Sequence, residues 1–380
     1  MRIGILGGGQ LGRMLALAGY PLGIHTEVYD PAPDACAGQV APLVGAPYDD
    51  WDALARFAEG KQCITYEFEN VPLATAQWLE ARVPVHPTPR ALELFQDRLL
   101  EKQFLNSIGI PTPAFAPIDP TDPDSALERT GLPCVVKTRR FGYDGKGQGV
   151  AHTHAEYRAL VQRFQPHALI AEALVPFERE VSAIGVRSLS GEIALYPLVE
   201  NIHQEGILRV SIVDVLPPLL PTHAAGEDAT RSPSPRHEHG SEGEDYVRRL
   251  LEALNYVGVV ALEMFQVGAR LLANEVAPRV HNSGHWTIEG AETSQFENHL
   301  RAILGLPLGS VAPRGYCAMV NLIGALPPIE AVLRIPNAHL HLYGKTPRPG
   351  RKLGHITLRA DTREARDALL QQTLELLSRV

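Results

Sequence analysis

The sequence predicts an α/β protein, made of an N-terminal βαβ unit, a central α+β region and a small C-terminal α/β region. Two observations support this prediction. Residues 2–30 contain a strand pattern, a glycine turn, an amphipathic helix and a second strand, which is typical of a unit that opens a parallel sheet. Further along, apolar strand patterns alternate with helical patterns, and from about residue 313 short strands are followed by a last helix.

The composition is ordinary for a globular enzyme of two or three domains. The chain has 380 residues, of which 45% are hydrophobic and 21% are charged. The net charge of −8 argues against a general nucleic-acid binder, which would more often be basic. A local cationic pocket for a phosphorylated small molecule is compatible with this charge.

The cysteines and the apolar runs predict a cytoplasmic protein. No apolar run is long enough to span a bilayer, and the chain starts directly on a strand pattern rather than a signal peptide. The cysteines are far apart and form no CxxC pair, so we expect free thiols in a reducing compartment. They are Cys36, Cys63, Cys134 and Cys317.

The glycine turn of the first unit allows two interpretations. Gly7, Gly9 and Gly12 match a GxGxxG pattern between a strand and a helix, and Asp30 follows at the end of the next strand. This arrangement is found in dinucleotide-binding units, where the helix N-terminus holds a pyrophosphate. A turn that only packs, or that holds a polar part of another substrate, explains the pattern equally well. No later segment resembles a hydride-transfer site.

The elements expected after the first unit follow the order of the chain. A strand with a polar exit is expected at 63–72, and an amphipathic helix over 91–108 that Gly109 and Pro111 end. Residues 222–245 are poor in apolar side chains and are expected to form a mobile surface loop. The remaining predictions are strands around 134–150, 168–175, 179–188 and 193–213, helices at 155–164, 244–258, 293–306 and 362–379, and a hairpin at 259–278.

The segment 137–149 has the composition of a loop that covers phosphates. Lys137 ends an apolar strand, and the eleven residues from 139 to 149 contain four glycines. A glycine-rich loop can donate backbone N–H groups to phosphate oxygens and can open again. It is not a Walker A loop, because GxxxxGK[ST] is absent. The alternative is a plain hairpin turn, which would need far fewer glycines. The residues of interest are Lys137, Gly142, Tyr143, Asp144, Gly145, Lys146, Gly147 and Gly149.

The segment "LIAEALVPFERE" suits a clamp for adenine at a hinge between two lobes. A strand alternation ends at Glu172, and the residues to Val175 carry backbone donors and acceptors. Glu180 could then bind a ribose hydroxyl. The alternative is that each of these glutamates is a solvated surface residue.

The hairpin at 259–278 permits a geometric prediction. If its turn is centred on Ala269, Glu263 lies directly opposite Glu275. Two facing carboxylates in an apolar sheet repel each other unless a cation lies between them, and hard oxygen ligands suit Mg²⁺ on nucleotide phosphates. Asn274 should then point to the opposite face unless the strand end twists. The alternative is a pair of solvated glutamates on an edge hairpin.

Taken together, these motifs resemble the ATP-grasp superfamily, and within it the 5-(carboxyamino)imidazole ribonucleotide synthase family. The resemblance covers most of the chain, and its most specific segments are "GYDGKGQG" and "APRVHNSGHWT". Other segments stand in the family's order: "GILGGGQLGRMLALA", "TYEFENVP", "DRLLEKQFL", "YPLVENIHQEGILRVS", "ALEMF", "SQFENHLRAI" and "HLYGKTPRPGRKLGHI".

The resemblance implies a fold and a reaction. It implies a Rossmann-like pre-ATP-grasp domain at 1–97, an ATP-grasp domain at 98–305 and a C-terminal domain at 306–380. Within the second, a glycine lid would cover about 98–175 and a nucleotide and metal subdomain about 176–305. The family uses ATP, with Mg²⁺, to activate bicarbonate as carboxyphosphate and to carboxylate aminoimidazole ribonucleotide. It also implies a homodimer, with neither a membrane nor a nucleic acid as partner.

The resemblance also implies roles for individual residues, carried over by motif. The residues implied for ATP are Arg98, Lys137, Glu172, Ala173, Leu174, Val175, Glu180 and His203, together with the glycine loop from Gly142 to Gly147. Those implied for Mg²⁺ are Glu263 and Glu275, with Asn274 near the phosphates. Those implied for the ribonucleotide are Tyr143, Asp144 and Lys146, with Lys345, Arg348, Arg351 and Lys352 for its phosphate. Those implied for bicarbonate and carboxyphosphate are Arg279, His281, Asn282 and Ser283.

Two residues of the last motif receive no role, and two other functions compete with the implied one. His285 and Trp286 are expected to pack beneath the site. One competitor is an ATP-grasp enzyme with a different acceptor, such as a formate-using transformylase or a biotin-type carboxylase. The other is the dinucleotide-dependent oxidoreductase that the glycine turn allows. The basic segment 347–352 and the "VHNSGHW" segment favour a ribonucleotide and bicarbonate.

Overall fold

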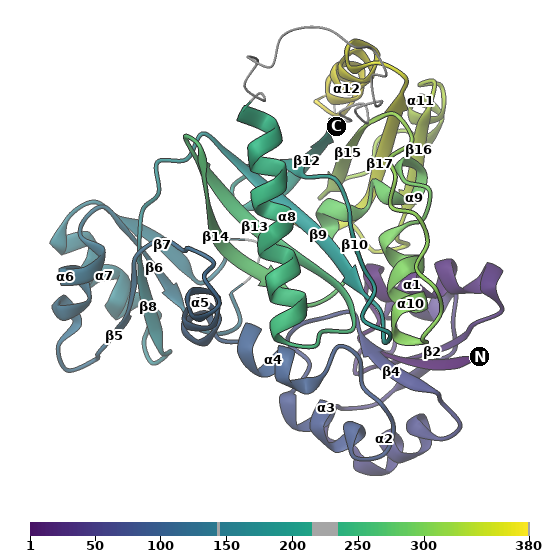
Figure 1. The fold of residues 1–380 in the computed structure, drawn as a ribbon, viewed down its shortest axis with the longest axis horizontal. Helices are drawn as coiled ribbons and strands as arrows, with labels where there is room; N and C mark the ends of the chain where they lie inside the picture. The colour runs from purple at the N-terminus through teal and green to yellow at the C-terminus, as the bar shows by residue number, and fades with distance from the viewer. Residues whose placement is uncertain (143–144, 215–234, 379–380) are drawn as a thin grey trace, which may run out of the picture.

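The computed structural model describes residues 1–142, 145–214 and 235–378, and the side chains within these ranges except those of 235–241 (Figure 1). In this part of the chain, three sheets confirm the predicted α/β class. One is a parallel sheet at the N-terminus, one a small antiparallel sheet, and one a large antiparallel sheet that runs through the centre and the C-terminal region. No helix among these residues is long and apolar enough to cross a membrane.

The N-terminal unit is a four-stranded parallel sheet in the order β3-β2-β1-β4, flanked by helices. The predicted strand–turn–helix–strand unit is therefore confirmed. Its strands are β1 (Arg2–Leu6), β2 (His25–Asp30), β3 (Leu43–Gly45) and β4 (Cys63–Tyr66), and its helical segments are α1 (Gln10–Gly19), η1 (Tyr20–Leu22), η2 (Cys36–Gln39), α2 (Trp51–Ala58) and α3 (Leu73–Glu80).

The glycine turn between β1 and α1 encloses a carboxylate of the protein itself. Glu67, which directly follows β4, accepts N–H groups from Gly9 at 2.9 Å and from Leu11 and Gly12 at 3.1 Å each. These are donors that the start of a helix leaves without a partner. A Cβ on Gly9 would lie 2.7 Å from a Glu67 oxygen, so the glycine is required by the close approach of this carboxylate.

Gly9→Ala is expected to destabilise the protein by about 1–3 kcal/mol, because the added methyl group displaces Glu67 from its buried donors. Urea unfolding followed by circular dichroism measures the change. Gly45→Ala is the matched control, because a Cβ there meets nothing closer than 3.8 Å. Equal stability of the two variants would show that the turn tolerates a side chain.

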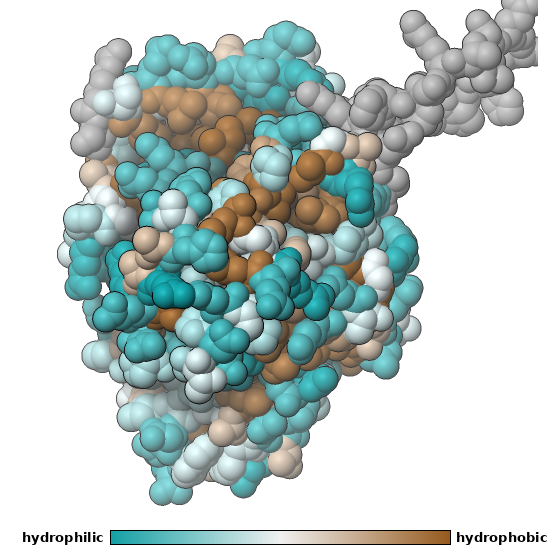
Figure 2. All heavy atoms as spheres, turned by 90° about the vertical axis from the view of Figure 1, so that its left-hand side faces the viewer, coloured by the Kyte–Doolittle hydropathy of each residue, from teal (hydrophilic) through white to brown (hydrophobic). Residues whose placement is uncertain are grey.

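A second unit projects from the body of the molecule, at the left of Figure 1. Its antiparallel sheet has the order β5-β8-β6-β7 and carries the glycine loop between β6 and β7. The face on this side is mainly hydrophilic with smaller apolar patches (Figure 2), as expected for a unit that extends into solvent. Its elements are β5 (Phe115–Ile118), η3 (Pro123–Ala126), α6 (Leu127–Thr130), β6 (Cys134–Thr138), β7 (Gln148–Ala151), α7 (His154–Phe164) and β8 (Leu169–Ala173).

The helix predicted before this unit is two helices, α4 (Pro89–Phe95) and α5 (Arg98–Ser107). The break falls at Asp97, whose carboxylate accepts the Leu99 N–H at 3.0 Å and so caps the second helix. The apolar spacing continues across the break, which is why the pattern alone predicted one helix. The break places Arg98 at the first turn of α5.

The large sheet has the order β14-β13-β9-β11-β12-β15-β17-β16, with β10 beside β9. The single strand predicted over 193–213 is three strands, because residues 196–198 leave the sheet and Glu205 and Gly206 form a turn. The strands are β9 (Arg179–Arg187), β10 (Ile193–Leu195), β11 (Val199–Gln204), β12 (Ile207–Val213), β13 (Gly258–Val267), β14 (Arg270–Ala277), β15 (Tyr316–Ile323), β16 (Ala338–Leu342) and β17 (Lys352–Ala360).

One helix corrects the predicted loop at 222–245. Helix α8 (Pro235–Ala253) packs on β9, β13 and β14, so residues 235–245 are helical rather than irregular. Residues 222–234 lie outside the described part of the chain. The other helices here are η4 (Asn282–Gly284), α9 (Thr287–Gly290), α10 (Gln295–Ile303), α11 (Ile329–Leu333) and α12 (Arg363–Leu377).

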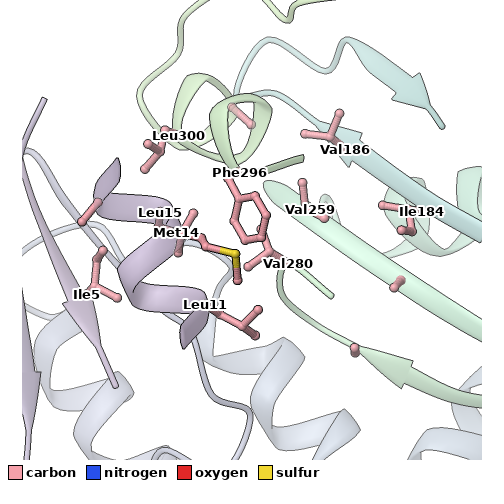
Figure 3. Close-up of a cluster of buried hydrophobic side chains, with 14 of the residues drawn as sticks. Ile5, Leu11, Met14, Leu15, Ile184, Val186, Val259, Val280, Phe296 and Leu300 are labelled. Carbon is pink, nitrogen blue, oxygen red and sulfur yellow. The ribbon is translucent and has the colours of Figure 1, made fainter. Parts of the chain in front are cut away.

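The C-terminal region and the N-terminal unit are both joined to the central sheet. Strand β15 pairs with β12, so the C-terminal strands extend the central sheet. Helix α1 packs against α10, and Met14 and Leu15 meet Phe296 and Leu300 in one buried core (Figure 3). This core holds the glycine turn and the carboxyl edge of the first sheet against the central sheet.

Candidate functional site

The register of the β13–β14 hairpin confirms that Glu263 pairs with Glu275, but for a different reason than predicted. Val267 pairs with Arg270, so the turn has two residues and is not centred on Ala269. With this turn alone, the residue opposite Glu263 would be one position earlier than Glu275, and Glu275 would face the other side of the sheet.

A β-bulge at Asn274 restores the pairing. Ala273 pairs with Met264, Glu275 pairs with Glu263, and Asn274 is the extra residue between them. A bulge places two residues of one strand opposite one residue of the other and breaks the strict alternation of faces. Asn274 therefore lines the same pocket as the two glutamates, and the prediction that it points to the opposite face is wrong.

Each of the paired carboxylates has a cationic or hydrogen-bonding partner. Glu275 Oε2 lies 2.8 Å from Arg98 Nη1, and Glu263 Oε1 lies 2.9 Å from His281 Nε2. Burial alone would raise the pKa of Glu275, but Arg98 and Lys137 hold it at about 2. Glu275 is thus available as an ionised oxygen ligand at neutral pH.

The predicted adenine segment has a buried charge cluster at its start. Glu172 is 3% exposed and lies 2.9 Å from Lys137 Nζ and 3.3 Å from Lys102 Nζ. Burial would raise its pKa, but the two lysines lower it to about 2. The Glu172 carboxylate therefore orients both lysines through Oε2, whereas its Oε1 has no hydrogen-bond partner among the described residues. Lys137 Nζ also lies 3.5 Å from Asn274 Oδ1.

The residues after Glu172 in this segment are held by main-chain hydrogen bonds. The N–H groups of Ala173 and Leu174 donate to Ala114 O at 2.8 Å and Pro133 O at 3.1 Å. Val175 follows β8, at the connection between the projecting unit and the central sheet.

The glycine loop lies over the turn between β11 and β12. A Cβ on Gly145 would be 3.2 Å from Glu205 O and from Gly206 Cα, so this close packing and its φ of +74° both require glycine. Gly142, Gly145 and Lys146 line the pocket, and Gly147 packs against Thr138 instead. Tyr143 and Asp144 lie outside the described residues.

Glu180 and His203 face each other across β9 and β11. His203 Nδ1 lies 2.6 Å from Glu180 Oε2, and both residues line the pocket. Burial alone would lower the pKa of His203, but the hydrogen bond to Glu180 and the nearby carboxylates raise it.

The segment after β14 brings three of its four predicted residues to the pocket. Arg279, His281 and Asn282 line it, and the Arg279 guanidinium is paired with Glu69. Ser283 is fully buried behind them, and its hydroxyl lies 2.8 Å from His281 Nδ1.

A chain of hydroxyl groups orients His281. The hydroxyl of Ser182 donates to Ser283 Oγ at 2.7 Å, which leaves the Ser283 hydroxyl to donate to His281 Nδ1. Nε2 of the ring then points to Glu263. Ser283 thus positions His281 in this structure.

The four predicted phosphate ligands are not brought to one place. Lys352 lines the pocket, and Lys345 Nζ is hydrogen-bonded to Gln10, which lines it. Arg351 donates to Thr346 O at 3.0 Å on its own loop, and Arg348 lines a separate surface pocket.

One pocket therefore collects most of the predicted residues from six parts of the chain. Those in its lining are Arg98, Lys137, Gly142, Gly145, Lys146, Glu180, His203, Glu263, Asn274, Glu275, Arg279, His281, Asn282 and Lys352. The described residues predicted for the site but outside the lining are Gly147, Glu172, Ala173, Leu174, Val175, Ser283, Lys345, Arg348 and Arg351.

Sequence reasoning missed several acidic and polar residues of this pocket. Glu69 and Asn70 follow β4, where the polar exit of a parallel strand could have marked them. Glu101 is 2% exposed and accepts the Val276 N–H at 2.6 Å, and burial raises its pKa to about 8. A glutamate in an amphipathic helix carries no such signal. Gln10 and Asn201 were also missed.

The donor arrangement at the glycine turn argues against the dinucleotide alternative. A pyrophosphate would need the N–H groups at the start of α1, and Glu67 already accepts three of them. Asp30, the residue that would bind a ribose, accepts the Gly8 N–H at 2.6 Å.

Comparison with known families divides the chain into three matching regions. A ribonucleotide synthetase pre-ATP-grasp domain matches residues 1–96, an ATP-grasp domain matches 103–296, and a phosphoribosylaminoimidazole carboxylase C-terminal domain matches 317–369.

Relatives of this kind match the chain over its whole length. N5-carboxyaminoimidazole ribonucleotide synthase of Pseudomonas aeruginosa is 47% identical over 378 residues, covering 99% of both chains. The crystal structure of the corresponding synthetase from Thermus thermophilus is 54% identical, with a TM-score of 0.90 over 100% of this chain and 99% of that one. The Aspergillus clavatus synthase in complex with ADP and 5-aminoimidazole ribonucleotide is 29% identical, with a TM-score of 0.86 over 100% and 99%. The chain therefore belongs to the N5-carboxyaminoimidazole ribonucleotide synthase family of ATP-grasp ligases.

Proposed function

We propose that this protein uses ATP and bicarbonate to carboxylate 5-aminoimidazole ribonucleotide, giving the N5-carboxyamino product, ADP and phosphate in purine biosynthesis. The observation that carries the proposal is the facing pair Glu263 and Glu275, directly beside Arg279, His281 and Asn282 in one pocket. Such a pocket can hold a nucleotide phosphate next to a small oxyanion. The relatives named for this reaction support the same conclusion.

The residues divide into groups by the charge that they face. Lys137 and Arg98 carry fixed positive charge beside the carboxylates and are proposed to hold the phosphates of ATP. Phosphoryl transfer depends mainly on such positioning and charge stabilisation. Val175 is proposed to contact adenine through its main chain, and Glu180 to bind the ribose, as the hinge position of the segment suggests.

The oxyanion side of the pocket is proposed to form carboxyphosphate. Bicarbonate attacks the γ-phosphate, the O–P bond to ADP breaks, and carboxyphosphate then gives CO₂ and phosphate beside the amine. Arg279, held by Glu69, offers charge there, and His281, held by Ser283, lies beside it in contact with Glu263. Because carboxyphosphate is labile in water, the glycine loop is proposed to exclude solvent, with Tyr143, Asp144 and Lys146 reaching the ribonucleotide.

The donor set fits Mg²⁺. Glu263 and Glu275 are ionisable oxygen donors on one face of the hairpin, and Asn274 adds an amide oxygen through the bulge. No group of three or more acidic, histidine or cysteine side chains suitable for a metal occurs among the described residues, so ATP phosphates are proposed to complete the ligand shell. The ion would supply charge neutralisation on those phosphates.

The remaining assignments are also proposals. Lys345 and Lys352 are the favoured ligands for the ribonucleotide phosphate, since they lie at or beside the pocket, and Arg348 and Arg351 would have to move to join them. The domain limits 97/98 and 305/306 are proposed on the sequence pattern. A cytoplasmic location agrees with four unpaired cysteines. A homodimer, testable by light scattering, is proposed from the family resemblance alone.

The purified protein is expected to release ADP from ATP and Mg²⁺ only when both bicarbonate and 5-aminoimidazole ribonucleotide are supplied. A coupled assay for ADP, run with each component omitted in turn, measures this dependence. Glycinamide ribonucleotide with formate, and biotin with bicarbonate, serve as the competing acceptors. The proposal would be contradicted if the rate of ADP release did not depend on the aminoimidazole ribonucleotide over a wide range of its concentration.

A further inference from the structure

A buried polar cluster lies directly behind Asn282. His285, His355 and Tyr343 are at most 1% exposed, and Asn321 is 4% exposed. Asn282 Nδ2 lies 2.9 Å from His285 Nδ1, and the hydroxyl of Tyr343 lies 2.7 Å from His355 Nδ1. None of these four residues lines the pocket, whereas Asn282 does.

One main-chain carbonyl determines the direction of the hydrogen bonds that join Asn321, Asn282 and His285. Leu208 O can only accept, so the Asn321 group 2.9 Å from it is the Nδ2 amide nitrogen. Asn321 Nδ2 then donates its second hydrogen to Asn282 Oδ1 at 2.7 Å. The Asn282 amide nitrogen must therefore be the group that donates to Asn321 Oδ1, at 3.0 Å.

The second hydrogen of Asn282 Nδ2 goes to His285. Because an amide nitrogen only donates, His285 Nδ1 must be the acceptor, and His285 must be a neutral ring protonated at Nε2. The Tyr343 hydroxyl lies 3.3 Å from the same Nδ1 and 2.7 Å from His355 Nδ1. Burial lowers the pKa of both histidines well below the usual value, in agreement with neutral rings.

This directed network leaves the side-chain amide of Asn282 with a single free hydrogen-bonding capacity. Both hydrogens of its amide nitrogen are used by Asn321 and His285, so only a lone pair on Oδ1 remains. An amide in this state cannot donate a hydrogen bond to an anion, but it can accept a hydrogen bond from a hydroxyl group of the anion.

We propose that His285 is a positioning residue that holds Asn282 as an acceptor, so that the oxyanion subsite prefers an anion bearing a hydroxyl group. Bicarbonate has this group, whereas nitrate has the same planar shape and no proton. The proposal rests on the function proposed above. It assigns a chemical role to a histidine that sequence analysis expected only to pack.

Two variants of similar shape test the role of His285. The oxygen of an asparagine can take the place of Nδ1, whereas a glutamine places its amide at the position of Nε2. His285→Asn is therefore expected to keep the bicarbonate KM within about threefold of wild type, and His285→Gln to raise it about tenfold or more. The KM for ATP is expected to be unchanged in both, and melting temperatures show whether packing alone has changed.

Nitrate tests the preference in the wild-type protein. Nitrate is expected to compete with bicarbonate, with an inhibition constant at least about tenfold above the bicarbonate KM. In His285→Gln, the ratio of the nitrate inhibition constant to the bicarbonate KM should be smaller. If neither variant folds, ¹⁵N spectra of histidine-labelled wild-type protein still report the rings. Neutral rings that do not titrate between about pH 5 and 8 are expected for His285 and His355, with His285 protonated at Nε2.

The outcomes separate this role from the proposed function. Wild-type protein without bicarbonate-dependent ADP release would overturn the function, and this role with it. Three results would overturn the positioning role alone, provided that turnover depends on bicarbonate. They are an equal bicarbonate KM in both variants, wild-type binding of nitrate as tight as that of bicarbonate, and a His285 ring protonated at Nδ1.

Discussion

Glu275→Gln is expected to lower kcat by on the order of a thousandfold while the protein stays folded. The substitution removes one of two facing carboxylates and the partner of Arg98, which lies 2.8 Å away. The loss of negative charge weakens the binding of a divalent cation at the hairpin. Arg98, without its partner, can also shift away from the phosphates. Steady-state ADP release with saturating substrates measures the effect, and circular dichroism reports the fold.

Glu200→Gln is the matched control for this variant. Glu200 lies in the same sheet, its side chain is 37% exposed against 40% for Glu275, and it is paired with Arg179 at 2.9 Å. It does not line the pocket. Near-normal turnover in Glu275→Gln, or an equal loss in Glu200→Gln, would remove Glu275 from the metal site.

Glu172→Gln is expected to destabilise the protein by about 3–5 kcal/mol, the largest effect on stability that we predict. The variant leaves Lys102 and Lys137 buried beside each other without their shared carboxylate. Breaking a buried ion pair is costly because the remaining charges have neither water nor a partner. Urea unfolding measures the loss, and turnover is expected to fall as well because Lys137 moves.

The difference in unfolding free energy between the wild type and Glu172→Gln depends on pH through the pKa of Glu172. The folded protein holds this pKa at about 2, below the usual value of 4.5. The contribution of Glu172 to stability is therefore fully present above pH 4.5 and is lost as the pH falls toward 2.

Glu297→Gln is the control for the loss of stability. It removes an i,i+4 ion pair in which the Glu297 side chain is 28% exposed, and it should cost at most about 0.5 kcal/mol. A loss below about 1 kcal/mol for Glu172→Gln would show that the lysines find other partners.

The fold and most of the pocket could be predicted from the sequence because they depend on local patterns. The first βαβ unit, the glycine loop and the segment from Arg279 to Asn282 are each continuous in the chain. Long-range pairing carries no such pattern. Glu172 was predicted as part of an adenine clamp, and only the fold shows that Lys102, seventy residues earlier, neutralises it.

The hairpin shows how a correct prediction can rest on an incomplete cause. The facing pair was predicted from a turn centred on Ala269, but a two-residue turn and a bulge at Asn274 produce it together. No sequence pattern marked the bulge. Its position decides that Asn274 joins Glu263 and Glu275 on one face, which periodicity alone would have excluded.

The carboxylate inside the glycine turn has a consequence for redesign. The glycines of this turn are compatible with a bound phosphate, and what excludes one is Glu67, between 55 and 58 positions away in the chain. Motif searches that score only the glycines would therefore group this chain with nucleotide-cofactor enzymes. An engineer who wished to graft such a cofactor here would begin at the end of β4, and would leave the glycines untouched.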